Sequence, residues 1–281
     1  HPELKVPNPV QRWGQPELDS KRVGFNASMA LSDTTELYGF GLFSRSDGTS
    51  DFNWRNPDTS TGAYKTSSLF PGWDLRSIYP LGFSPSYSND QDDVQVVAGV
   101  RGHFNERFGW DVSASWGRNR IDYHLANSIN ASMGPSSPTA FYLRQLSQTE
   151  KILNANSNYE LPVVSLPQPV NIAFGAEARN ETYGVKAGDA ASYLVGPGAA
   201  IGLDANANGA PGFSDRQAGS WGQDSYAAYL DVEVPVTKAL SLGGAARYEH
   251  FSEFGSTVNG KLSARYALSE DLALRGSYST G

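Results

Sequence analysis

The stretch Leu240-Ser-Leu-Gly-Gly-Ala-Ala-Arg-Tyr-Glu-His250 decides the fold of this chain. Mostly apolar side chains occupy one phase of a two-residue period, and Ser, Arg and Glu fall in the other. The pattern recurs in Val258–Tyr266 and in Leu272–Tyr278. Successive side chains of a strand point to opposite faces of a sheet, so each stretch predicts a strand with one apolar and one polar face. Such strands are typical of membrane β-barrels.

The alternation extends along the chain and predicts an all-β protein of about ten antiparallel strands. Long connections at 51–91, 127–148 and 186–222 mostly alternate with short ones. Outer-membrane barrels have short periplasmic turns and long extracellular loops, so this ordering favours a transmembrane β-barrel over a soluble sheet. The predicted strands span residues 18–31, 36–50, 92–105, 109–126, 149–161, 169–185, 223–235, 239–253, 256–268 and 271–280.

The two phases differ in charge. Alternate residues in 23–29, 94–100 and 226–232 are apolar and uncharged. A Lys or Arg at the bilayer midplane costs about 2–4 kcal/mol, so a lipid-facing surface is expected to lack both. The opposite phase is rich in charge, which predicts a polar lumen, although salt bridges across the wall are an equal alternative. The charged residues predicted to face the lumen include Arg101, Glu177, Arg247, Glu249, Arg265 and Arg275.

Aromatic residues are predicted to form two girdles on the apolar face, at the depth of the lipid headgroups. One girdle, near the short turns, would comprise Tyr38, Trp110, Tyr159 and Tyr266. The other, near the long loops, would comprise Tyr226, Tyr248 and Tyr278.

Bulk composition excludes several classes of protein. The net charge is -7 and no block of Lys or Arg occurs, which argues against a nucleic-acid partner. Cysteine is absent, which removes disulfide scaffolds and thiolate metal sites. No run of about 18 apolar residues is present, so a helical membrane span is excluded. We find no catalytic motif and expect neither an enzyme nor a cofactor.

Several segments resemble the barrel of TonB-dependent outer-membrane receptors. They are Ala173–Arg179, Asp224–Glu233, Arg247–Leu262 and Leu274–Gly281, supported in the loops by Leu69–Gly72 and Asn130–Pro138. The resemblance implies a bacterial outer-membrane location and a 22-stranded barrel, of which these ten strands would form a part. It also implies an N-terminal plug that closes the lumen, energy from the TonB system, and uptake of a scarce nutrient such as an iron-siderophore or a sugar.

The chain departs from the family pattern at both ends. We find no plug sequence or TonB box before residue 17, and the sequence stops at Gly281, where family members usually continue into a Phe-Arg-Ala-Pro-Ser-like stretch and further strands. We therefore expect a Pro-rich segment at 1–16 and a partial barrel at 17–281, whose lumen residues would contact a plug or line the transport path. The expected partners are the lipid bilayer, the plug and TonB system of the full-length protein, and an unidentified small molecule.

Aromatic and arginine side chains gather in the predicted loops, where they could capture a substrate or pack the loops together. The candidate ligand-binding residues are Trp54, Trp73, Tyr79, Tyr142, Arg144, Arg216 and Trp221. A weaker pattern, Asp204, Asn206 and Asn208 with Asp215 at the twelfth position, matches part of a calcium-binding EF-hand loop. Its flanks predict no helices, so a simple turn-rich loop is the favoured interpretation.

Two other functions stay open from the sequence. A passive porin-like barrel would share the wall but would need no plug. A soluble carbohydrate-binding β-sandwich would share the aromatic loops, but it would bury the apolar strand faces under a second sheet.

Overall fold

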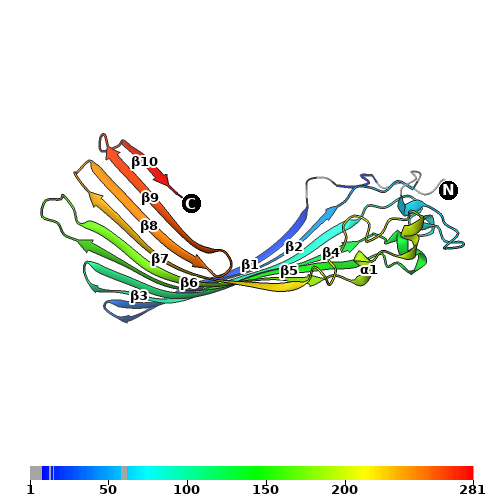
Figure 1. The fold of residues 1–281 in the computed structure, drawn as a ribbon, viewed down its shortest axis with the longest axis horizontal. Coiled ribbons are helices and arrows are strands. Elements are labelled where there is room, and N and C mark those ends of the chain that lie inside the picture. Colours follow the sequence, from blue (N-terminus) through cyan, green and yellow to red (C-terminus); the bar gives the residue numbers. More distant parts are fainter. Residues whose placement is uncertain (1–7, 13, 15, 58–61, 281) are drawn as a thin grey trace.

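The computed structural model describes residues 8–12, 14, 16–57 and 62–280 and contains one antiparallel sheet of ten strands (Figure 1). Each strand pairs with its neighbours in chain order, so the sheet is a simple meander. The strands are β1 (Glu17–Ser32), β2 (Thr35–Asp51), β3 (Ser86–Asn105), β4 (Phe108–Ala126), β5 (Phe141–Leu161), β6 (Val170–Ala187), β7 (Gly219–Pro235), β8 (Leu240–Phe251), β9 (Gly255–Ala267) and β10 (Ala273–Ser279). This confirms the all-β barrel fold, with all ten predicted strands in the predicted order. The predicted segment at 1–16 lies partly outside the described residues.

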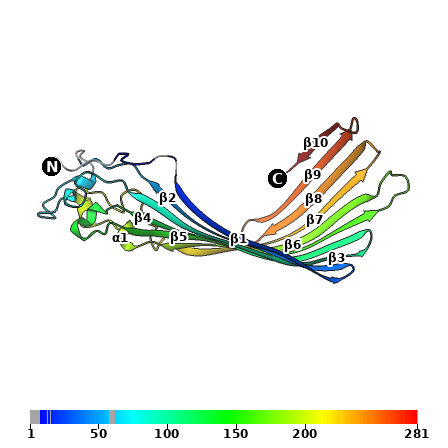
Figure 2. The ribbon, with the colours of Figure 1, turned by 180° about the vertical axis from the view of Figure 1, so that it is seen from behind.

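The sheet is strongly twisted and curved, and it is open. Both views show the short turns at one end of the long strands and most loop structure at the other (Figures 1 and 2). Within the described ranges, β1 and β10 each pair with one strand only, so the curved wall has two free edges.

Three strands begin earlier than the alternation predicts. β3 starts at Ser86 rather than at 92, β5 at Phe141 rather than at 149, and β7 at Gly219 rather than at 223. These extensions lie at the loop end of the sheet. The extension of β3 is mostly polar, whereas that of β5 contains Phe141 and Leu143, which are 3% and 0% exposed in a cluster with Leu125 and Ala207. The period of two residues disappears in these extensions although the strands continue, because polar residues fill both phases in β3 and loop residues bury the start of β5.

The apolar face of the sheet is uncovered. Its large side chains are exposed to a degree unusual for a folded protein, with Val23 at 72% and Leu262 at 67%. No second sheet lies over it in the part of the chain that the structure describes, which rules out the β-sandwich. Large contiguous apolar surfaces mark contact with lipid or with another protein. Further exposed residues of this face include Phe25, Met29, Val112, Leu153, Leu230, Val258 and Leu274.

The apolar residues form a band across the sheet, and this band is not parallel to the rows of paired residues on neighbouring strands. One row of paired residues leads from Met29, near the turn end of the apolar stretch in β1, to Tyr248, at the loop end of the stretch in β8. The strands are therefore inclined relative to the band. Strands of membrane barrels tilt by about 35–45° from the barrel axis, which produces this displacement.

The long loops, at 52–85, 127–140 and 188–218, pack against one another; we call them the loop assembly. They contain the helix α1 (Ala190–Tyr193) and four 3-10 helices, η1 (Gly62–Tyr64), η2 (Leu75–Ser77), η3 (Ala131–Ser136) and η4 (Pro197–Ile201). All three loops supply the buried cluster Ala63, Tyr64, Leu75, Phe83, Ile129, Ala131 and Leu203. Within the described ranges, no helix is long and apolar enough to cross a bilayer.

One buried side chain ties two of the loops together. The amide group of Asn130 donates to the carbonyl oxygens of Ala191 at 2.8 Å and Leu194 at 2.9 Å. Its Oδ1 accepts from the hydroxyl of Ser132 at 2.7 Å. Because buried polar groups must be hydrogen-bonded, these bonds fix loop 127–140 on loop 188–218.

Candidate functional site: the polar face and the loop assembly

A charged network lies on the polar face across β6 and β8. The Glu177 carboxylate lies 2.8 Å from the Arg179 guanidinium and 3.2 Å from that of Arg247. Arg247 also lies 3.1 Å from Glu249. The strand register places these residues on one face, and Glu177 is shared by two arginines. Three of the predicted lumen residues are thus brought together, paired with one another.

A second group lies nearer the short turns, on β2 and β3. Arg101 lies 2.8 Å from Glu36 and 5.1 Å above the centre of the Tyr38 ring. Gly99, opposite Tyr38 in the ladder, leaves room for that ring. The prediction that Tyr38 lies in the apolar girdle is therefore wrong. Both phases of 37–43 contain apolar residues, which hides the true phase of this strand.

The other aromatics of the turn-end girdle do lie on the apolar face. Trp110 stacks on Phe104 with a centroid separation of 5.9 Å. Phe108 contacts Tyr159 at 6.1 Å and Phe174 at 6.3 Å. Together these rings form an aromatic surface on the apolar face, which agrees with the girdle predicted for that end of the strands.

Arg265 and Arg275 face each other across β9 and β10 in one register pair. Both side chains are exposed, and within the described residues neither forms a salt bridge. Like charges directly opposite each other in a sheet are destabilising. This corner of the polar face therefore favours an anionic partner.

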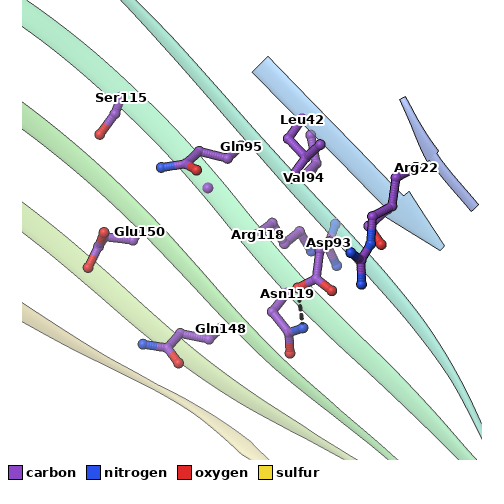
Figure 3. Close-up of a pocket in the computed structure, with 12 residues that line it drawn as sticks. Arg22, Leu42, Asp93, Val94, Gln95, Ser115, Arg118, Asn119, Gln148 and Glu150 are labelled. Atoms are coloured by element: carbon purple, nitrogen blue, oxygen red, sulfur yellow. Dashed lines mark hydrogen bonds between the residues drawn. The ribbon is translucent and has the colours of Figure 1, made fainter. Parts of the chain in front are cut away.

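A hollow of about 490 Å³ lies on the polar face and is lined by residues of the five strands β1 to β5 (Figure 3). Its floor is open at Gly117, where an added Cβ would meet nothing closer than 3.7 Å. Asn119 donates to Asp93 at 2.5 Å, while the side chains of Gln95 and Gln148 have no hydrogen-bonding partner within the described residues. The remaining lining residues include Arg22, Leu42, Ser44, Val94, Ser115, Arg118 and Glu150.

An exposed aromatic pair adjoins the hollow. Tyr183 of β6 and Trp221 of β7 stack with a centroid separation of 6.2 Å and are 44% and 53% exposed. Tyr183 is the ladder partner of Gln148, which lines the hollow. Trp221 was a sequence candidate, whereas Tyr183, Asn119 and Gln148 were missed. Only the register reveals that these residues share one face, since they are far apart in the sequence.

Several candidate loop aromatics lie within the loop assembly. The Tyr79 ring stacks on Phe83 at 4.7 Å, and its hydroxyl donates to the carbonyl of Ser128 at 3.1 Å. Trp73 packs against the same cluster through Phe70 at 5.8 Å. The backbone N–H of Trp54 donates to the side chain of Gln11. These contacts support the packing role for Trp73 and Tyr79.

Of the remaining candidate ligand-binding residues, some contact other side chains of the protein and others are exposed. The Arg144 guanidinium lies between two rings, 4.6 Å from the centre of Tyr123 and 4.5 Å from that of Phe213. The Tyr142 hydroxyl donates to Asp122 at 2.7 Å. Arg216 is exposed. Arg144 and Tyr142 thus anchor the loop end of the sheet, while Arg216 and Trp221 are accessible to a ligand.

The guanidinium of Arg55 lies beside the predicted calcium-binding loop. The Arg55 Nε donates to Asn208 Oδ1 at 2.7 Å, and the Asn208 amide donates to Asp204 at 3.2 Å. No group of three metal-ligating His, Cys, Asp or Glu side chains occurs within the described ranges. Calcium binding stays a prediction, which calorimetric titration of the intact protein with calcium tests.

Burial changes the ionisation of the loop assembly. Desolvation raises the pKa of the phenols of Tyr64 and Tyr79 above their ordinary value. The pKa of Arg55 is lowered by its desolvation, partly offset by the nearby Asp204 carboxylate. Both phenols are therefore neutral donors at physiological pH and stabilise the packed loops.

Comparison with known proteins identifies the family. Residues 24–281 match the TonB dependent receptor-like β-barrel family, and the chain belongs to it. The barrels of this family are outer-membrane receptors and transporters rather than enzymes. No curated protein sequence matches the chain.

Solved structures share the fold at low sequence identity. The closed form of the ferric-catecholate import receptor Fiu of E. coli K12 superposes with a TM-score of 0.57 at 16% identity, over 96% of this chain and 44% of that one. Its open form gives 0.58 at 13% identity, over 96% and 48%. The RagAB peptide importer in its closed-closed state gives 0.58 at 9% identity, over 94% and 32%. The chain thus spans less than half the length of these receptor chains.

Proposed function

We propose that this chain forms part of the wall and loops of a bacterial outer-membrane receptor that imports a small nutrient with energy from TonB. The observation that carries the proposal is the uncovered apolar face of a ten-stranded meander, joined to the family match over residues 24–281. The polar face would line the path of the substrate, and the loop assembly would form the outer mouth.

The charges of the polar face suit contact with a plug in the full-length protein. The Glu177 network offers carboxylates and guanidiniums from β6 and β8, on either side of β7, and the Arg265 and Arg275 pair offers unneutralised positive charge. Arg265 and Arg275 are exposed and without a salt bridge within the described residues, so their guanidiniums are available to a polar partner. We expect plug carboxylates opposite the two arginines.

Growth of deletion strains tests the proposed transport. The gene and the TonB gene are deleted separately, and each strain is grown on single carbon and iron sources. We expect loss of the gene to slow growth on one nutrient at low concentration, and loss of TonB to reproduce that defect. Normal growth of the TonB strain on the same nutrient would instead indicate a passive, porin-like barrel.

Fractionation of cells tests the proposed location independently. We expect the protein in the outer-membrane fraction, with an electrophoretic mobility that changes on boiling, as for other stable barrels. Recovery of the complete protein in the soluble fraction would contradict the proposal.

A further inference from the structure

We propose that the hollow on the polar face and the Tyr183 and Trp221 pair form a subsite for a neutral carbohydrate. This inference rests on the proposed import function and names its substrate class. The hollow and the ring pair are separate observations, joined by the strand register.

The register arranges these residues in a continuous row. One ladder row crosses seven strands from β1 to β7, with all its side chains on the polar face. Neighbouring strands are about 4.8 Å apart, so the row is about 29 Å long and suits a chain of several sugar rings. Its members are Arg22, Ser44, Asp93, Asn119, Gln148, Tyr183 and Trp221.

The polar lining has the hydrogen-bonding groups that sugar hydroxyls need. A hydroxyl both donates and accepts, and a carboxamide offers an acceptor oxygen beside two N–H donors. Gln95 and Gln148 have unused carboxamides within the described part of the chain, and Asn119 retains a free acceptor oxygen. Figure 3 shows these amides on one wall of the sheet together with Glu150 and Ser115.

The aromatic pair supplies the other half of sugar recognition. Sugar rings have apolar C–H faces, which pack on exposed aromatic rings. Trp221 and Tyr183 lie beside the hollow rather than in the loop core, and about half of each side chain is exposed. A ligand can reach the exposed part of both rings.

The charge of the hollow opposes an anionic substrate. The ionisable side chains on the polar face of the hollow are one cation, Arg22, and two anions, Asp93 and Glu150; Arg118 borders the hollow, but its register partner is Val94 on the apolar face. A negatively charged iron chelate would need a binding surface with net positive charge, because like charges repel each other. Unpaired charge is also costly to remove from water. The small excess of negative charge in this lining disfavours an anion, and the uncharged amides beside it favour a neutral ligand.

The test measures binding to the intact protein purified in detergent. The probes are an array of neutral gluco-, xylo-, manno- and galacto-configured oligosaccharides and a ferric tris-catecholate complex. We expect at least one neutral oligosaccharide to bind. Binding should weaken about tenfold in Trp221→Ala, the equivalent of about 1.4 kcal/mol, and Trp221→Phe should restore it.

Gly117→Leu fills the hollow, and Gly260→Leu is its matched control. An added Cβ would have the same 3.7 Å clearance from a backbone carbonyl at both positions, but Gly260 lies on the apolar face. We expect Gly117→Leu to weaken oligosaccharide binding at least as much as Trp221→Ala, and Gly260→Leu to leave it unchanged.

Two results would overturn the subsite. One is an array without a bound neutral oligosaccharide. The other is oligosaccharide affinity that neither Gly117→Leu nor Trp221→Ala changes. Binding of the ferric complex alone would reject the carbohydrate but leave TonB-dependent import intact, whereas TonB-independent growth rejects import and leaves the binding result standing.

Discussion

The sheet and the loop assembly bury opposite kinds of surface. In the sheet, large apolar side chains such as Val23 and Leu262 are exposed, while the charged Glu177 is largely covered by its partners. In the loop assembly, Leu75 and Ile129 are 1% and 0% exposed, as in an ordinary water-soluble core. The difference indicates two solvents: hydrocarbon around the wall, and water around the loops.

Truncation of the loop core should have the largest effect. Phe83→Ala removes a buried ring that stacks on Tyr79 and contacts Tyr64. We expect the loop assembly to lose about 3–5 kcal/mol of stability, measured as faster proteolysis of the loops in the intact protein. Leu69→Ala, at an exposed loop position, is the control. Equal resistance of both variants would show that the loops have no common core.

A charge on the apolar face should cost nearly as much, but only in a bilayer. We expect Leu153→Arg to reduce the free energy of unfolding in lipid vesicles by about 2–4 kcal/mol. Asn154→Arg, the next residue on β5, places the same charge on the polar face and should cost much less. Comparable losses for the two variants would contradict the assignment of the faces.

Removal of the shared carboxylate should have an intermediate effect. Glu177→Ala leaves Arg179 and Arg247 close together without their common partner. We expect a loss of about 1.5 kcal/mol in the free energy of unfolding, the lower range for a hydrogen bond to a charged group because the network is partly exposed. Glu177→Ala should cost less free energy of unfolding in an Arg247→Met background than in the unchanged protein. A double-mutant cycle measures this difference, which is the coupling between the two side chains.

High pH should loosen the loops slightly. Burial raises the pKa of Tyr64 above its ordinary value of about 10, so the folded loops hold this proton more tightly than the unfolded loops. The stabilisation is complete below about pH 10 and is lost as pH rises further. Loop proteolysis across this range should accelerate above about pH 10, and Tyr64→Phe should reduce the acceleration. Acceleration already near neutral pH would contradict this origin.

The sequence predicts most of the wall because lipid contact imposes strict alternation. β1, β4, β8 and β9 lie close to their predicted bounds, and their apolar phases face the same side. Alternation is lost at the loop end of the sheet, so the first residues of β3 and β5 were predicted as loop: polar residues fill both phases at the start of β3, and the loops bury the start of β5. In β2, apolar residues in both phases concealed the true face of Tyr38.

The candidate site was less predictable because tertiary contacts determine it. The aromatics of loop 52–85 suggested either a binding mouth or a packed core, and only the contacts of Tyr79 and Trp73 with that core distinguish the two roles. The hollow extends over Gly117, which has no side chain to fill it, and its lining residues come from five strands. No local pattern places Gln148 beside Tyr183, since only the register does so.

Spin-label accessibility along β5 tests the central claim, that lipid solvates the apolar face, most directly. The chain contains no cysteine, so single substitutions at residues 152–156 can each carry one label on the intact protein in lipid vesicles. The account predicts contact with lipid-soluble oxygen at 153 and 155, and lower oxygen accessibility at 152, 154 and 156. Equal accessibility at all five positions, or a water-soluble nickel complex that reaches 153 and 155, would contradict it.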